Sequence, residues 1–183
     1  SEDFYTCLSK LYSYADYITI NISSPNTEGL RDFHEENSMK KLLEGLNKLK
    51  KNKNIDTPLA IKLSPDIDEK EISNIVEIIN KYKIEGIIIS NTTNQNREKL
   101  LDGKKNEVGG LTGRPKKDIS TNLIKKFNQE LNKKITIIGV GGVESGKSEF
   151  EKIAEGADVS KLNKGRVNRG TGWVKERKEF KAG

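Results

Sequence analysis

Four polar or glycine-rich clusters carry the residue types that could do chemistry in this chain, and each follows a short apolar run. They are residues 21–27 (NISSPNT), 64–66 (SPD), 90–93 (SNTT) and 139–142 (GVGG). Amide and hydroxyl side chains both donate and accept hydrogen bonds, and glycine lets a backbone approach a ligand closely. One such cluster alone is typical of a turn. Four clusters at corresponding positions indicate a shared binding site.

Lys62 is an independent sign of a ligand site, because it lies inside the apolar run 59–63. An unpaired ammonium in a buried strand is costly, so this side chain needs an anionic partner. Two interpretations stay open from the sequence. Lys62 forms a buried ion pair with a carboxylate, or it contacts an anionic or electron-accepting ligand.

Residues 141–148 (GGVESGKS) match the phosphate-binding pattern G-x-x-x-x-G-K-[ST] between a predicted strand and a predicted helix. A nucleoside triphosphatase also needs an apolar strand that ends in a Mg²⁺-binding Asp. The other strands run instead into Asn21, Ser64 and Ser90. A P-loop nucleotide-binding protein is therefore an alternative only, although glycine N–H groups at a helix start can bind phosphate in either case.

The elements that must position these clusters are short strands separated by amphipathic helices. Runs rich in Ile and Val predict strands at residues 17–20, 59–63, 86–89 and 135–140. Apolar residues at helical spacing predict helices around residues 4–12, 39–49, 72–79, 123–131 and 150–154. Asp66 and Glu69 have the spacing of a capping box ahead of the third helix. This alternation predicts an α/β fold with a parallel sheet, whose ligands bind beyond the carboxyl ends of the strands.

Some further segments and single residues lead to local predictions. Residues 94–117 are polar, contain glycines and are too long for an ordinary connector, so they are predicted to form a lid or a ligand loop. Cys7 lies on the apolar stripe of the first helix and is predicted to be in the core. His34 lies in a polar loop and is predicted to be solvated.

The composition excludes several classes of protein. The 183 residues include one Cys and one His, so neither a disulfide framework nor a metal site is predicted. Eight basic and two acidic residues lie at 160–183, and their balance of +6 equals the net charge of the whole chain. The rest shows no basic stripe, so no nucleic acid partner is expected. No apolar stretch approaches the ~20 residues of a membrane span, and no signal peptide is evident, so the chain is predicted to be soluble as given.

Taken together, the clusters resemble the C-terminal part of a class 2 dihydroorotate dehydrogenase. The resemblance runs from about Ala15 to Ala157. It rests on motifs in matching order: NISSPNT, the strand around Lys62, SNTT, GGLTGRP at residues 109–115, and IIGVGGVESG followed by FEKIAEGA.

That family is a (β/α)8 barrel, so the resemblance implies a partial (β/α)8 TIM barrel with approximately strands four to eight. Residues 1–159 would form the partial barrel domain that binds FMN and dihydroorotate. Residues 160–183 would form a divergent basic C-terminal segment, because agreement with the family deteriorates after Ala157. The first three strands of the barrel have no counterpart, so the chain is expected to be an incomplete fragment that is inactive alone.

The activity implied by the resemblance is oxidation of dihydroorotate to orotate in de novo pyrimidine biosynthesis. Hydride passes from C6 of the substrate to N5 of FMN while a base removes the C5 proton, and a quinone is the final electron acceptor. Ser24 matches the catalytic base, and Thr27 matches a threonine that relays the proton. Sister enzymes of class 1 have Cys in place of Ser24, so this serine indicates class 2 and a quinone. A hydroxyl is a weaker base than a thiolate, whose reference pKa is about 8.5, so Ser24 needs such a relay.

Other residues match ligand-binding positions of the family. The cofactor-binding positions are Asn21, Lys62, Ser90, Gly113 and Gly142. The substrate-binding positions are Asn21, Asn26, Asn91 and Thr92. Asn amides suit the imide edge of a pyrimidine ring, and a fixed ammonium stabilises negative charge that develops on a flavin.

The resemblance also implies partners and a location. Membrane association would come only through N-terminal helices that this chain lacks, at the cytoplasmic face of the bacterial inner membrane or at the mitochondrial inner membrane. An N-terminal half of the barrel is a further expected partner. The eighth strand of the family is expected to be weak or absent here, and no site residue carries over to Asn163 or Lys164. An inactive truncated scaffold is therefore the remaining alternative.

Overall fold

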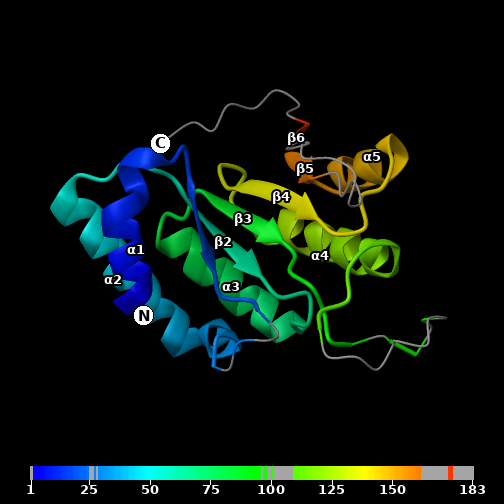
Figure 1. Ribbon diagram of the computed structural model, residues 1–183, viewed down its shortest axis with the longest axis horizontal. Helices are drawn as coiled ribbons and strands as arrows, with labels where there is room; N and C mark the ends of the chain where they lie inside the picture. The colour runs from blue at the N-terminus through cyan, green and yellow to red at the C-terminus, as the bar shows by residue number, and fades with distance from the viewer. Residues whose placement is uncertain are drawn as a thin grey trace.

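The part of the chain that the structure describes contains one sheet whose strands lie in chain order. The computed structural model describes residues 2–24, 27, 29–95, 97–98, 100, 109–161 and 173–174. The strands are β1 (Ile18–Asn21), β2 (Leu59–Leu63), β3 (Gly86–Ile89), β4 (Thr136–Val140), β5 (Val159–Lys161) and β6 (Trp173–Val174). Strands β1 to β5 pair in parallel, and β6 pairs antiparallel with β5 (Figure 1).

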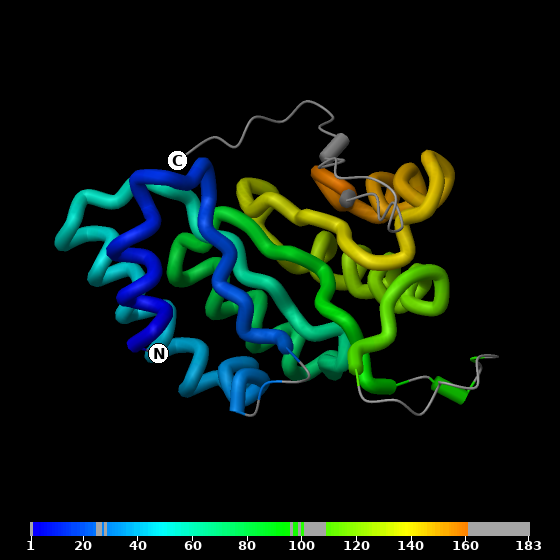
Figure 2. Tube along the Cα trace, in the orientation of Figure 1, coloured from blue at the N-terminus to red at the C-terminus, as the bar shows by residue number. Residues whose placement is uncertain are grey.

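Helices connect the parallel strands. The α-helices are α1 (Glu2–Leu11), α2 (Glu36–Lys53), α3 (Glu69–Lys81), α4 (Lys117–Glu130) and α5 (Gly146–Ala154). Short 3-10 helices are η1 (Tyr12–Tyr14), η2 (Arg31–His34) and η3 (Arg114–Lys116). In the orientation of Figures 1 and 2, α3 and α4 lie behind the sheet, α1 and α2 lie to its left, and α5 lies beside β5.

Successive strand residues point to opposite faces of the sheet, and the two faces differ in what covers them. One face packs against α2, α3 and α4 in the main hydrophobic core, which includes Ile20, Ile61, Ile87, Ile137, Leu46, Ile75 and Phe127. The opposite face carries a smaller buried cluster of Ala60, Ile88 and Ile138. Asn21 pairs with Lys62, and Lys62 pairs with Ile88. The two polar residues therefore lie on the second face, at the carboxyl ends of their strands.

The predicted elements agree with the structure in type and order. The strands have small shifts at their ends, whereas the helices begin earlier than predicted, α4 at Lys117 and α5 at Gly146. Strands β2 and β3 have the predicted limits, β1 is displaced by one residue, and β4 begins one residue later than predicted. After Ala157 a strand does form: β5 is short but pairs in parallel with β4 through all three of its residues. The expected domain boundary between residues 159 and 160 falls inside this strand.

The predicted capping box of α3 is wrong by two residues. Asp68, not Asp66, caps the helix: its side chain accepts a hydrogen bond from the Glu71 backbone N–H at 2.8 Å. The Glu71 carboxylate in turn accepts one from the Asp68 N–H at 2.8 Å. Asp66 lies outside the helix because it forms an ion pair with Arg31.

An Asp68→Ala variant is expected to lose about 1 kcal/mol of unfolding free energy, because it leaves N-terminal N–H groups of α3 without an acceptor. Urea unfolding followed by circular dichroism measures this loss. Glu71→Gln is the control, since Gln also completes a capping box and should change stability much less. Equal stability of Asp68→Ala and the parent would contradict the assignment of this cap.

The predictions for Cys7 and His34 are also wrong. Cys7 is exposed, because the neighbouring Leu8 takes the buried position of α1. His34 is 6% exposed, because it lies beneath the loop that follows β2 and accepts a hydrogen bond from Ser64 N–H.

Much of the predicted lid at 94–117 lies outside the described residues. Its described parts include an antiparallel bridge between Thr93 and Leu111, and η3, which leads into α4. Its role as a ligand loop stays a prediction. In the described ranges, no helix is long and apolar enough to cross a membrane. The same ranges hold no group of three or more His, Cys, Asp or Glu side chains that could bind a metal ion.

Candidate functional site

Two predicted site residues from different strands meet in one hydrogen-bonded group. Asn21 ends β1, and Asn91 follows β3 at the same edge of the sheet. The Asn91 amide donates to Ser23 Oγ at 3.1 Å and to Asn21 Oδ1 at 3.5 Å. Ser23 Oγ donates to Asn21 Oδ1 at 2.9 Å. The carboxyl ends of non-adjacent strands are therefore joined by polar side chains above β2.

Ser23 is a site residue that the sequence alone did not single out. It is fully buried, and its hydroxyl both accepts from Asn91 and donates to Asn21. It thereby fixes the orientation of both amides. The adjacent serines in NISSPNT were its only sequence signal, and the family motif drew attention to the second of them.

The structure brings the predicted base and its predicted relay into direct contact. Thr27 Oγ1 donates to Ser24 Oγ at 3.0 Å, with no intervening group. Ser24 is half-buried, whereas Thr27 is exposed. The predicted substrate residue Asn26 lies outside the described residues. Thr92 is half-buried, and its backbone N–H donates to Asn91 Oδ1 at 2.8 Å, which further restrains that amide.

Lys62 and Ser90 occupy the centre of this sheet edge. Lys62 is half-buried and lies beside Asn21 in the sheet register. Ser90 is 2% exposed, and its Oγ has no hydrogen-bond partner among the described residues. A buried hydroxyl without a partner is costly, so Ser90 is suited to contact a ligand atom.

The two predicted cofactor glycines have different surroundings. Gly113 has φ +81°, and no atom of the described residues lies within 4 Å of the position a Cβ would take, so these residues leave space for a ligand. Gly142 has φ +71°, and a Cβ there would lie 2.5 Å from Lys117 Cα. The close approach that requires Gly142 is therefore to the start of α4.

The loops that carry the site are tied together by Asp66. Its carboxylate pairs with Arg31 at 3.0 Å and accepts a hydrogen bond from Thr93 Oγ1 at 2.5 Å. These contacts join the loops that follow β1, β2 and β3. His34 Nδ1 contacts Arg31 O at 3.1 Å, and Nε2 accepts from Ser64 N–H at 3.3 Å. Burial is the main reason that the pKa of His34 is lowered, which favours the neutral ring that these contacts need.

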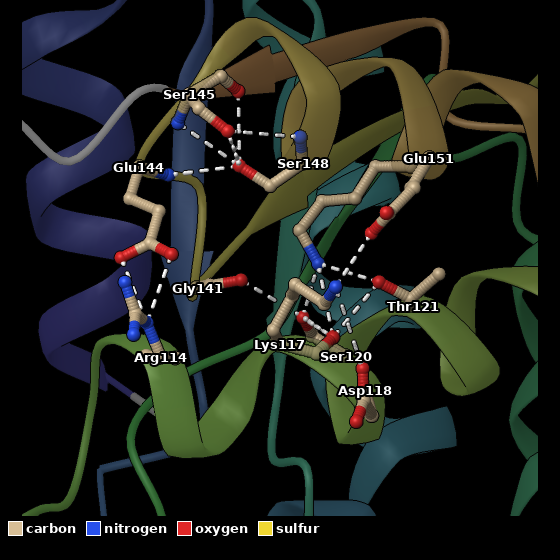
Figure 3. A network of polar contacts seen from close by, with 11 residues as sticks. Arg114, Lys117, Asp118, Ser120, Thr121, Gly141, Glu144, Ser145, Ser148 and Glu151 are labelled. Carbon is tan, nitrogen blue, oxygen red and sulfur yellow. Dashed lines mark hydrogen bonds and ion pairs between the residues drawn. The ribbon is translucent and has the colours of Figure 1, made fainter.

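Residues 141–148 form a capped helix start. Ser145 is the N-cap of α5, and Ser148 completes a capping box with it. Ser148 Oγ accepts from the Glu144 and Ser145 N–H groups at 3.0 Å and donates to Ser145 O at 2.9 Å (Figure 3). The hydroxyl that a P-loop would present to Mg²⁺ is thus used to cap the helix, which disfavours the P-loop alternative.

Two buried lysines, Lys116 and Lys152, were also missed by the sequence analysis. Both are at most 1% exposed, and both have lowered pKa values, to about 7 for Lys116 and about 8 for Lys152, with burial as the main cause. Lysine is normally exposed, so nothing in the sequence around either residue indicated its burial. A cavity of about 460 Å³ lies away from this edge, at the amino end of β4, where Ile135 and Asp158 are among its lining residues.

The comparisons with known proteins point to one family. A family profile described as dihydroorotate dehydrogenase matches residues 1–179. A Bartonella henselae protein named dihydroorotate dehydrogenase (quinone) is 40% identical over 173 residues, covering 92% of this chain and 48% of that protein. An Escherichia coli O1:K1 protein of the same name is 39% identical over 185 residues, covering 96% of this chain and 53% of that protein. The chain thus spans about half the length of the curated relatives it matches.

Solved structures agree with these matches. Crystal structures described as DHODH from Eimeria tenella, one with ferulenol and one ligand-free, match with TM-scores of 0.85 and 0.84 at 27% identity. They cover 93% of this chain and 50% and 52% of those chains. These neighbours are TIM barrels, which confirms the predicted α/β class and partial (β/α)8 barrel.

Proposed function

Because this chain belongs to the dihydroorotate dehydrogenase family, we propose that the protein containing it oxidises dihydroorotate to orotate. FMN is the hydride acceptor, a quinone is the final electron acceptor, and the reaction belongs to de novo pyrimidine biosynthesis. The observation that carries the proposal is the hydrogen-bonded group of Asn21, Ser23 and Asn91 at the same sheet edge as Lys62.

The residues at this edge fit a flavin. Ser90 offers a buried hydroxyl without a described partner, and no atom of the described residues lies within 4 Å of a Cβ built at Gly113. Lys62, Asn21, Ser90, Gly113 and Gly142 would hold the cofactor. When bound, FMN supplies an acceptor for the hydride that leaves the substrate. The fixed ammonium of Lys62 stabilises negative charge that develops beside it, and burial strengthens this effect.

The substrate is held by amides and deprotonated by a hydroxyl. Asn21, Asn91, Asn26 and Thr92 present donors and acceptors to the pyrimidine ring. Ser24 Oγ removes the C5 proton. A hydroxyl can both donate and accept, so across the 3.0 Å contact Ser24 can pass its proton to Thr27 Oγ1 as the new proton arrives, while the exposed Thr27 releases its own proton to solvent.

The same proposal covers partners and location. Among the described strands, β1 has one neighbour, β2, so its other edge has room for further strands of a barrel. We assign that edge to an N-terminal half of the barrel, in the same or a separate chain. A quinone partner places the enzyme at a quinone-bearing membrane, either the cytoplasmic face of the bacterial inner membrane or the mitochondrial inner membrane. Membrane association comes through the N-terminal region, and no nucleic acid takes part.

Purification of the protein at its natural full length tests the proposal. It is expected to carry FMN with an absorbance maximum near ~450 nm and to form orotate when supplied with dihydroorotate and a quinone. A Lys62→Met variant, which keeps an unbranched side chain of nearly the same length but removes its charge, should retain less FMN. Tight binding of Mg²⁺-nucleotide without flavin would instead support the P-loop alternative. A folded protein that binds neither ligand would support the inactive scaffold.

A further inference from the structure

Lys116 is inserted between the loop ends that carry the candidate site. It is the last residue of η3, and its side chain is 1% exposed. Its Nζ donates to Ser90 O at 2.6 Å, the backbone carbonyl of the residue whose buried hydroxyl has no described partner. A Cβ at Gly141, whose φ is +101°, would lie 3.0 Å from this Nζ. The ammonium therefore occupies space between the ends of β3 and β4.

The surroundings of Lys116 Nζ supply too few hydrogen-bond acceptors and too little negative charge for an ammonium group. Ser90 O is its one hydrogen-bond acceptor among the described residues, although an ammonium carries three hydrogens. Of the charged groups around it, Lys152 on α5 and Lys62 on β2 repel it, and Asp66 attracts it. That carboxylate is already paired with Arg31. A buried cation in this position lacks the negative charge that normally accompanies one.

Lys152 is also buried but differs from Lys116 in its hydrogen-bond acceptors. Its Nζ has three oxygen acceptors: Ser120 Oγ at 2.5 Å, Thr121 Oγ1 at 3.0 Å and Lys117 O at 3.4 Å. Figure 3 shows these acceptors on the first turns of α4, where Ser120 also donates to Gly141 O at 3.0 Å. Lys152 thus ties α5 to α4 with an acceptor for each hydrogen of its ammonium, whereas a protonated Lys116 would have one acceptor among the described residues for three hydrogens.

We propose that Lys116 is a positioning residue of this site, and that it takes up a proton when an anionic ligand, here FMN, binds at the adjacent strand ends. The inference rests on the proposed function. Ligand negative charge offsets the repulsion from Lys62 and Lys152, so the charged form of Lys116 becomes favourable. The proton comes from solvent and binds to Nζ. The resulting ammonium then holds the Ser90 backbone through the hydrogen bond to Ser90 O, and this orients the Ser90 hydroxyl.

The acid–base properties of the ligand-free protein agree with this proposal. Burial, and then the charges of Lys152 and Lys62, lower the pKa of Lys116 from 10.5 to about 7. Between these two values the folded chain binds fewer protons than the unfolded chain. Stability linked to this group is therefore gained as the pH rises from about 7 towards 10.5, and is lost as the pH falls through that range. Near neutral pH, both forms of Lys116 are populated.

The test is calorimetric titration of FMN into the flavin-free full-length protein at pH 7.5 to 9, in buffers of different ionisation enthalpy. The parent is expected to take up a fraction of one proton per FMN bound. Lys116→Met should remove the Lys116 share of that uptake, leaving only the contributions of the FMN phosphate and of Lys152, and weaken FMN binding about tenfold at pH 7.5, with a smaller loss at pH 9. Riboflavin is the second probe. It lacks the phosphate, whose own titration would add to the proton uptake measured with FMN.

Two further variants separate positioning from packing. Lys152→Met removes a repelling charge, so the midpoint of proton uptake should move to higher pH. Lys125→Met, on the exposed face of α4, should leave binding and proton uptake unchanged. If Lys116→Met only lowers the melting temperature and leaves proton uptake and FMN affinity as in the parent, the inference about Lys116 is overturned, while the proposed function stands. If the parent binds no FMN, the proposed function is overturned and the inference with it.

Discussion

A Ser24→Ala variant of the full-length protein is expected to reduce its flavin about 10² to 10⁴ times more slowly than the parent when dihydroorotate is added. A rate loss of this size is typical of removing a general base. We assign that role to Ser24 because, among the described residues of this loop, its hydroxyl is the one that contacts the relay residue Thr27, at 3.0 Å. Stopped-flow absorbance near ~450 nm in a single turnover measures the rate without a contribution from the quinone step.

Ser24→Cys is expected to be much less impaired than Ser24→Ala. A thiol has a reference pKa of about 8.5, so it supplies its own base as the pH rises and depends less on a relay. Its rate should therefore increase with pH through the thiol titration. Thr27→Val and Thr27→Ser form a matched pair, in which only the first removes the hydroxyl. Comparable single-turnover rates for Ser24→Ala and the parent would remove Ser24 from the mechanism.

A Gly142→Ala variant is expected to lose about 2 to 5 kcal/mol of unfolding free energy, which lowers the melting temperature by about 10 °C. Two effects combine at this position. An alanine at φ +71° is strained by about 1 to 2 kcal/mol, and its Cβ would lie 2.5 Å from Lys117 Cα and 2.7 Å from Lys117 N. Backbone atoms at the start of a helix cannot rotate away as a side chain can.

Gly146→Ala is the matched control for this prediction. Gly146 is the first residue of α5, and in the part of the chain that the structure describes no atom lies within 4 Å of the position a Cβ would take there. Alanine should therefore be neutral, or stabilise the protein by about 0.4 to 1 kcal/mol. Thermal unfolding of both variants checks the pair. Similar melting temperatures for Gly142→Ala and Gly146→Ala would show that the start of α4 yields to the added methyl group.

Strands β1 to β4 were predictable because they are continuous apolar runs, whereas β5 was expected to be weak or absent and β6 was not predicted. Strands β2 and β3, buried on both faces, agree with the prediction at both ends. The start of α3 was less predictable, because Asp66 and Asp68 are both acceptable caps. Only the folded chain brings Arg31 close to Asp66 and leaves Asp68 for the helix.

The candidate site was predictable in part. The clustering of Asn21 and Asn91 followed from the rule that parallel strands end at one edge. The burial of His34 and Lys116 did not follow from the sequence, because both lie in polar segments whose burial depends on distant loops packing over them. Contacts such as that between Lys116 and Ser90, 26 residues apart, leave no periodic pattern along the chain.

The contacts of Asp66 couple the loops that follow β1, β2 and β3 to one another in stability. The Asp66 carboxylate binds both the Arg31 guanidinium and the Thr93 hydroxyl. Replacing Asp66 alone therefore removes an interaction from both residues. The stability effects of substitutions at positions 31, 66 and 93 should therefore be non-additive, because both contacts depend on the same carboxylate.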